Sequence, residues 1–116
     1  MKSKGLLRRV ARRVAYHRTN SYRLMGAYYW TIDKHKKALG WWHRGVQEGE
    51  RMGARPQLAR LYFEVGRYLL EEKAQYKKLD NLKGEAYLGK ARALYEEMKM
   101  ETYVEDIDRV VEMRCF

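Results

Sequence analysis

Three histidines and one cysteine are among the side chains of this sequence that could bind a metal or act as a nucleophile. His35 and His43 are eight residues apart, not the four that would place two imidazoles on one face of a helix. We expect surface or capping roles for these two and for His17. Cys115 has no second cysteine with which to form a disulfide and no histidine near it in the sequence. The sequence therefore predicts no metal, no cofactor and no catalytic thiol.

The carboxylates occur in short pairs at 71–72, 96–97 and 106/108. We expect these pairs to lie on exposed faces of helices. The sequence contains no matched acid and base, no glycine-rich phosphate loop and no nucleophile elbow. These observations predict a protein that is not an enzyme.

Charge is unevenly distributed along the chain. Residues 1–60 carry 15 Lys and Arg against three acids, a balance of +12, whereas residues 61–116 carry 10 against 12, a balance of −2. Residues 1–32 contain no acid at all. A basic half of this kind is compatible with nucleic acid, an anionic surface or an acidic protein as partner.

The spacing of apolar residues predicts helices along the whole chain, and no sheet. We expect a break at Thr19-Asn20, a cap at Asp33, a stop at Gly53, a first-turn proline at Pro56 and a turn at 80–81. These signals divide the sequence into about six helices, near 3–17, 20–32, 34–53, 55–73, 83–99 and 102–114.

Two segments share one pattern of aromatic, small and apolar residues. The first half of the pattern contains an aromatic residue, a large apolar residue, a glycine and a further bulky residue. The second half contains a small residue, a bulky residue four positions later and another small residue three positions after that. The first copy consists of Tyr22, Met25, Gly26, Tyr29, Ala38, Trp42 and Gly45, and the second of Tyr62, Val65, Gly66, Leu69, Gly84, Leu88 and Ala91. In the second copy the two halves are six residues further apart, which predicts a loop insertion over 75–83. Small residues allow two antiparallel helices to cross closely, and bulky ones fill the space where the helices diverge.

This pattern resembles the tetratricopeptide repeat, a pair of antiparallel helices. The sequence of residues 49–100 is similar to the tetratricopeptide regions at the C-terminal ends of bacterial signalling proteins, namely adenylate or guanylate cyclases and ATPase-type regulators. The resemblance implies an all-α, right-handed stack of helix pairs forming one domain over 1–116. Its parts would be a half-repeat helix at 1–19, repeats at 20–54 and 55–99, and a capping helix at 100–116.

The resemblance also implies which aromatic residues lie in the core. Tyr22, Tyr29 and Trp42 occupy positions that the family buries, and Trp41 is expected to pack on the neighbouring repeat. For Trp30 two interpretations stay open, an anchor in the binding groove or a core residue between repeats.

Tetratricopeptide repeats bind peptides or helices in a concave groove, so the resemblance implies a non-catalytic protein-interaction scaffold within a larger signalling protein. The family's groove positions correspond to Asn20, Arg23, Ala27 and Trp30 in the first repeat, and Arg60, Phe63 and Arg67 in the second. Three arginines among them favour an acidic partner, because guanidinium pairs with carboxylate through two hydrogen bonds.

The alternative function is binding of nucleic acid or an anionic surface by the basic first half. The cationic side chains that would contact phosphates are Arg8, Arg9, Arg12, Arg13 and Arg18. We also expect a possible homodimer, because Leu6, Leu7, Val10 and Val14 form an apolar stripe with only one neighbouring helix to cover it. No run of residues is long and apolar enough for a membrane span, and we expect a cytoplasmic protein.

Overall fold

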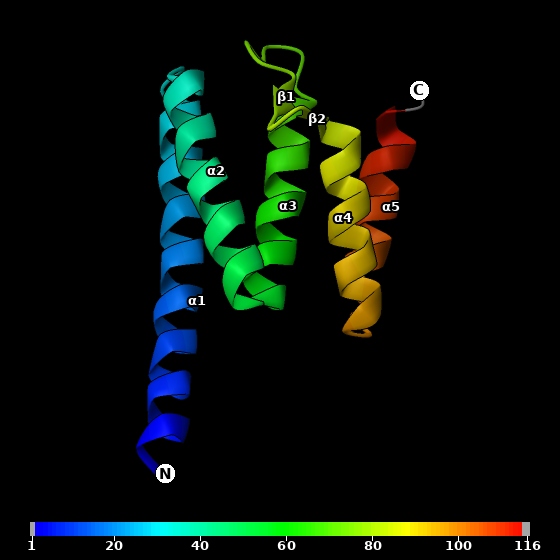
Figure 1. The fold of residues 1–116 in the computed structure, drawn as a ribbon. Helices are drawn as coiled ribbons and strands as arrows, with labels where there is room; N and C mark the ends of the chain where they lie inside the picture. Colours follow the sequence, from blue (N-terminus) through cyan, green and yellow to red (C-terminus); the bar gives the residue numbers. More distant parts are fainter. Residues whose placement is uncertain (1, 115–116) are drawn as a thin grey trace. The chain divides into compact units, whose positions relative to one another are not determined.

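The computed structural model describes the backbone of residues 2–114 and the side chains of 5–10, 13–14 and 16–113. The backbone forms five helices and one short hairpin, in the order α1 (Lys2–Thr31), α2 (His35–Met52), α3 (Arg55–Leu69), β1 (Lys78–Leu79), β2 (Leu82–Lys83), α4 (Gly84–Glu97) and α5 (Glu101–Arg114) (Figure 1). The chain divides into two compact units, 1–58 and 59–116. The expected all-α fold class is confirmed, and the right-handed stack and the limits of the repeats stay predictions.

In the first unit α1 and α2 are an antiparallel pair held together at a glycine. A Cβ atom on Gly26 would lie 2.0 Å from Nε1 of Trp42, so no other residue fits without displacement of the indole. With no side chain at Gly26, the indole N–H of Trp42 reaches the backbone carbonyl of Arg23, at 3.2 Å. Gly49 of α2 makes a close approach to Leu58, since a Cβ atom there would lie 2.9 Å from Cδ1 of Leu58, and it lies in ordinary van der Waals contact with Thr19 of α1. The crossing at Gly26 that the motif predicts is therefore present.

The core of this pair contains Trp42 at 0% exposure and Trp30 at 1%. Trp30 stacks on His35 with ring centroids 3.7 Å apart and lies 5.4 Å from the ring of Trp42. The burial expected for Trp42 is confirmed. Of the two interpretations of Trp30, the structure agrees with a core residue and not with an exposed groove anchor. The surface or capping role expected for His35 is wrong, because stacking on Trp30 buries its ring. Tyr22, Tyr29 and Trp41 are half-buried.

The predicted break at Thr19-Asn20 is wrong, since α1 runs without interruption from Lys2 to Thr31. Thr19 is fully buried beside Gly49, so this β-branched residue packs inside the helix pair instead of capping a new helix. Asp33 is not the N-cap of α2 either. It has a left-handed backbone, at φ 63°, and the N-cap is Lys34.

Two other turn signals are confirmed. Gly53 ends α2 in the left-handed conformation, and the N–H of Ala54 donates to the carbonyl of Gly49 across it at 3.0 Å. Pro56 is the second residue of α3, where its missing N–H leaves no helical bond unmade.

In the second unit α3 and α4 cross at two glycines. A Cβ on Gly66 would lie 2.9 Å from the carbonyl oxygen of Gly84, and a Cβ on Gly84 would lie 2.7 Å from that of Gly66. Gly66 also faces Leu88, as Gly26 faces Trp42. The glycine of each motif thus faces the same motif position of the following helix, in two separate helix pairs.

The expectation of no sheet is wrong at the insertion. β1 and β2 pair antiparallel with Leu79 opposite Leu82, and Asp80 and Asn81 both have positive φ, at 50° and 67°. These are the dihedral signs of a two-residue hairpin turn that aspartate and asparagine tolerate. The phenol of Tyr87 donates to the carbonyl of Leu79 at 2.8 Å, which fixes the hairpin to α4. α3 ends at Leu69, four residues before the predicted end.

Replacement of Gly26 by alanine tests the crossing of α1 and α2. We expect Gly26→Ala to destabilise the protein by roughly 1–3 kcal/mol or more, because the indole of Trp42 must move. Gly40→Ala is the matched control, since Gly40 lies in α2 and a Cβ atom there would meet nothing within 4 Å. That control should stabilise by about 0.5–1 kcal/mol through helix propensity. Urea unfolding followed by circular dichroism gives both values, and equal effects of the two changes would refute the close crossing.

Candidate functional site

The groove residues predicted on α1 are largely inaccessible. Arg23 is 6% exposed and Trp30 is 1% exposed, so neither side chain can serve as a surface contact for a partner. Their assignment to the binding site is wrong for a physical reason, because both lie on the face of α1 that packs on α2. Asn20 and Ala27 are half-buried and flank that face.

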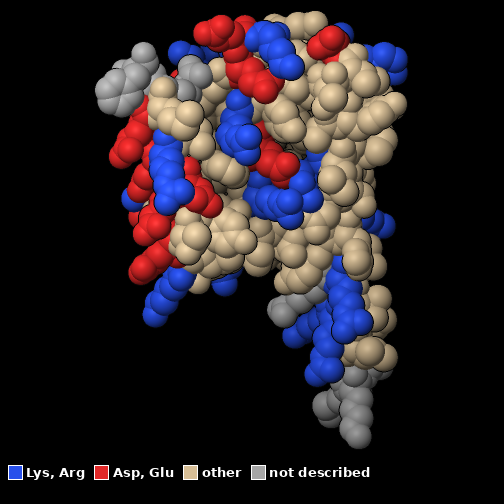
Figure 2. Space-filling model, turned by 180° about the vertical axis from the view of Figure 1, so that it is seen from behind, with Lys and Arg blue, Asp and Glu red and all other residues tan. Residues whose placement is uncertain are grey.

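The arginines near the start of α1 are placed differently. Arg8, Arg9 and Arg13 are exposed, and Arg12 lies outside the residues whose side chains are described. Arg18 keeps 55% of its side chain exposed and lies 3.5 Å from Glu48 of α2. Thr19 lies beside Gly49, close to the end of α2, and the first half of α1 extends past that end. Figure 2 shows basic side chains gathered along this projecting end.

The groove residues predicted on α3 lie together on one face. Arg60 and Arg67 are exposed and Phe63 is half-buried. The guanidinium of Arg67 lies over the ring of Phe63, 5.4 Å from its centroid. A cation above an aromatic face is held in place by the ring quadrupole, which leaves the edge of the guanidinium available for a second contact.

Carboxylates that the sequence analysis did not assign to the site lie on this same face. Oε2 of Glu64 is 3.7 Å from Nε of Arg60. Glu64 and Arg67 line a hollow of about 400 Å³ in the second unit, together with residues of α3, the segment after it, and α5: Tyr68, Leu70, Glu71, Val110 and Met113. The i, i+4 spacing of Arg60 with Glu64 and of Arg67 with Glu71 could have revealed these acids. The face is therefore mixed in charge, with apolar side chains in its floor.

A second hollow of about 430 Å³ lies between α4 and α5. It is lined mainly by apolar side chains, with Glu85 and Arg92 at its margin: Leu70, Leu88, Gly89, Ile107 and Val111. Val111 is 46% exposed although its neighbour in the hollow, Ile107, is 1% exposed. Helix α5 thus has a hollow on each side and is covered along only part of its length.

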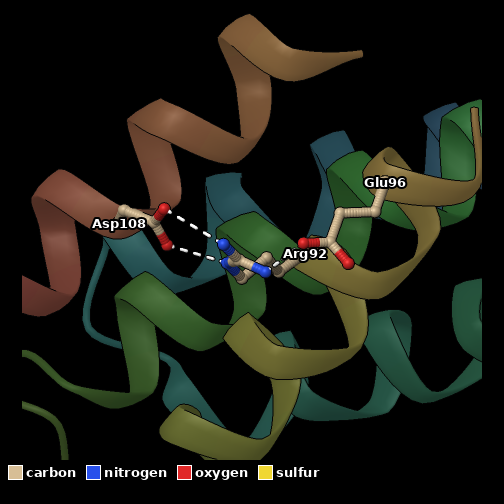
Figure 3. Close-up of polar contacts among 3 residues, drawn as sticks. All are labelled: Arg92, Glu96 and Asp108. Atoms are coloured by element: carbon tan, nitrogen blue, oxygen red, sulfur yellow. Dashed lines mark hydrogen bonds and ion pairs between the residues drawn. The ribbon is translucent and has the colours of Figure 1, made fainter. Parts of the chain in front are cut away.

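Arg92, which was not among the predicted site residues, joins α4 to α5. Arg92 donates from Nε to Oδ1 of Asp108 at 2.8 Å and from Nη2 to Oδ2 at 3.3 Å, and it also donates to Glu96 (Figure 3). These hydrogen bonds lower the pKa of Asp108 below its ordinary value, and the bond with Asp108 raises the pKa of Arg92. The rings of Tyr95 in α4 and Tyr103 in α5 stack with their centroids 4.8 Å apart, which is a second contact between these helices.

One guanidinium thus engages both carboxylates of the Arg92 cluster, one on α4 and one on α5. Within the part of the chain that the structure describes, no three His, Cys, Asp or Glu residues come together as metal ligands. None of the described helices is long and apolar enough to cross a membrane.

No protein-family model, curated protein or solved structure matches this chain.

The Arg92–Asp108 pair predicts a pH-dependent contribution to stability. Because the folded-state pKa of Asp108 is depressed, its contribution is present above the unfolded pKa of about 3.9 and is lost as the pH falls through the folded value. We expect Asp108→Asn to lower the free energy of unfolding slightly at pH 7 and to lower it by less near pH 2. Asp106→Asn is the control, since Asp106 pairs with Arg109 inside α5. Urea unfolding at both pH values measures the difference, and an equal effect of Asp108→Asn at both would contradict the assignment.

Proposed function

We propose that this chain is a non-catalytic helical scaffold of tetratricopeptide type, which binds a peptide or helix of a partner protein and belongs to a larger signalling protein. The observation that carries the proposal is the repeated crossing, in which Gly26 faces Trp42 and Gly66 faces Leu88 at equivalent motif positions. Repeated helix pairs present side chains of successive first helices to a partner. In this protein those first helices are α1 and α3.

The contacts with the partner are assigned to the exposed face of α3. Arg60, Phe63 and Arg67 remain accessible there, whereas Arg23 and Trp30 are buried in the helix pair of the first unit. Arg67 is held over Phe63 and lines the hollow, which also contains the apolar side chains of Leu70, Val110 and Met113. A peptide with a carboxylate next to an apolar side chain would meet the guanidinium and the hollow together. The partner is therefore proposed to be acidic and amphipathic.

A second candidate function is supported by a different observation. Arg8, Arg9 and Arg13 are exposed on the projecting part of α1, in a segment of 32 residues that contains no acid. Such a surface would bind nucleic acid or another polyanion mainly through charge. Binding of that kind weakens steeply between 50 and 200 mM salt, by about tenfold or more for several phosphate contacts.

Two labelled amphipathic peptides that share their apolar residues, one glutamate-rich and one lysine-rich, test the first proposal by fluorescence anisotropy. We expect the acidic peptide alone to bind, and both Arg60→Ala and Arg67→Ala to weaken it, by about tenfold for a charge-assisted contact. Arg109→Ala, which removes an exposed arginine paired within α5, is the matched control and should leave binding unchanged.

Two results would contradict this assignment. Equal binding of both peptides would show that the site does not prefer carboxylates. Binding that Arg60→Ala and Arg67→Ala leave unchanged would show that the peptide does not bind at the α3 face. A labelled DNA duplex titrated at 50 and 200 mM salt, with Arg8→Ala/Arg9→Ala as the variant, tests the second candidate in the same assay.

A further inference from the structure

Helix α1 carries a second set of apolar side chains, on its outward face. Eight large apolar residues expose between 37 and 66% of their surface. We call this set the outer stripe, and its members are Leu6, Leu7, Val10, Val14, Leu24, Met25, Tyr28 and Ile32. At 3.6 residues per turn they fall within about 100° of the helix circumference.

The outer stripe lies opposite the face that α2 covers. Among the α1 side chains that the structure describes, the buried residues are Thr19, Arg23, Gly26 and Trp30, and on a helical projection they are centred roughly 180° from the stripe. A helix with one packing partner has one apolar face and a polar face opposite it. In α1 the face opposite α2 is apolar instead, and α2 does not obstruct it. A contiguous exposed apolar surface of this kind marks an interaction site.

The positions of the stripe residues contain a symmetry. The stripe consists of two groups, at 6–14 and at 24–32, separated by the polar residues His17 and Ser21 on the same side of the helix. Six of the eight stripe residues form pairs with their midpoint at residue 19, namely Leu6 with Ile32, Val10 with Tyr28, and Val14 with Leu24. The other two, Leu7 and Met25, fall opposite Thr31 and Arg13. His17 and Ser21 have the same midpoint. If a second α1 runs antiparallel to the first, each group therefore meets the other group of its partner.

We propose that two copies of this chain associate through their outer stripes, with antiparallel α1 helices around a two-fold axis near residue 19. In this pairing Val10 packs on Tyr28 of the second copy and Val14 on Leu24, twice by symmetry. The polar His17 and Ser21 meet each other at the axis. Isologous pairing of this kind is the commonest closed arrangement of identical chains.

Charge selects the antiparallel over the parallel arrangement. Seven of the eight cationic residues of 1–32 lie before residue 19, and Arg23, the eighth, is on the α2 side. A parallel pair would place Arg9 and Arg13 of both copies side by side, with no acid between them. In the antiparallel pair each basic end lies along the almost uncharged second half of its partner's α1. Like charges are kept at opposite ends of the interface.

The apolar surface of the outer stripe approaches the size of a stable dimer interface. From Leu6 to Ile32 the helix rises about 39 Å. Eight half-exposed large side chains along this length present on the order of several hundred Å² of apolar surface. That value approaches the ~800 Å² per partner of a stable interface. An anionic lipid surface would also accept a basic amphipathic helix, but it gives no reason for the symmetry about residue 19.

This inference goes beyond the proposed scaffold function and uses none of the α3 residues. The first test is sedimentation equilibrium of the full chain between 1 and 200 µM, taken as roughly the range of weak to moderate dimers. We expect the mass to rise toward twice the 14.0 kDa of the chain. Val10→Glu and Tyr28→Glu should each weaken association at least tenfold while leaving the circular dichroism unchanged, because both residues are exposed in the single chain. Met113→Glu, a change at a 77% exposed residue of α5, is the matched control and should not affect association.

The second test determines the direction of the helices by cross-linking in a Cys115→Ser background. Val14→Cys and Leu24→Cys chains, mixed and oxidised, should form a heterodimeric disulfide. Neither chain should cross-link with itself, since an antiparallel pair centred on residue 19 separates the two copies of residue 14 by about 15 Å along the axis. A disulfide needs Cα atoms within about 7 Å.

Three outcomes would overturn the proposal. The first is a mass of one chain at all concentrations. The second is self-cross-linking of Val14→Cys, which would indicate parallel helices. The third is a single chain that binds phosphatidylglycerol vesicles and loses this binding in Val10→Glu, which would assign the stripe to a lipid surface. None of these results affects whether Arg67→Ala weakens binding of the acidic peptide. The dimer proposal and the scaffold proposal can therefore fail independently.

Discussion

The absence of a side chain at Gly26 is the constraint on which the first unit depends. It allows the indole of Trp42 to lie against the backbone of α1 and to donate to the carbonyl of Arg23. This contact sets both the register and the rotation of α1 on α2. The rotation buries Trp30 and Arg23, and it turns the outer stripe away from α2. A single small residue thus decides which aromatic side chains form the core and which apolar ones remain at the surface.

The second unit uses the same principle with different side chains. Gly66 and Gly84 let two backbones approach, and Leu88 takes the place that the indole has in the first unit. Leucine has no donor, so here the crossing depends on packing alone. Polar contacts are added at its margins, where Tyr87 fixes the hairpin and Arg92 joins α4 to α5. The exposed face of α3 is presented by a helix whose opposite face is fixed in this way.

The features that sequence predicted correctly are those set by local chemistry. Gly53 ends a helix because it reaches the left-handed conformation without cost, and the two glycine crossings follow from residue size at fixed spacing. The errors have a different origin. Thr19 and Asp33 resemble capping residues locally, but packing against Gly49 keeps Thr19 inside a continuous helix. Trp30 and Arg23 were assigned by analogy to a groove, and only the rotation of α1 on α2 reveals that they face inward. Long-range packing of this kind leaves no mark in a short window of sequence.

The continuity of α1 has a consequence for how its first half acquires order. Starting a helix is unfavourable because several residues must be fixed before the first hydrogen bond forms, whereas each later residue adds one bond at little cost. In α1 the stretch from Thr19 to Thr31 is held by α2 and supplies this nucleus. The preceding residues extend it by propagation alone, and propagation in water is close to neutral in free energy. Any surface that covers Leu6, Val10 and Val14 would therefore contact a helix that is already nucleated. Binding would have to supply only the small free energy needed to complete that helix.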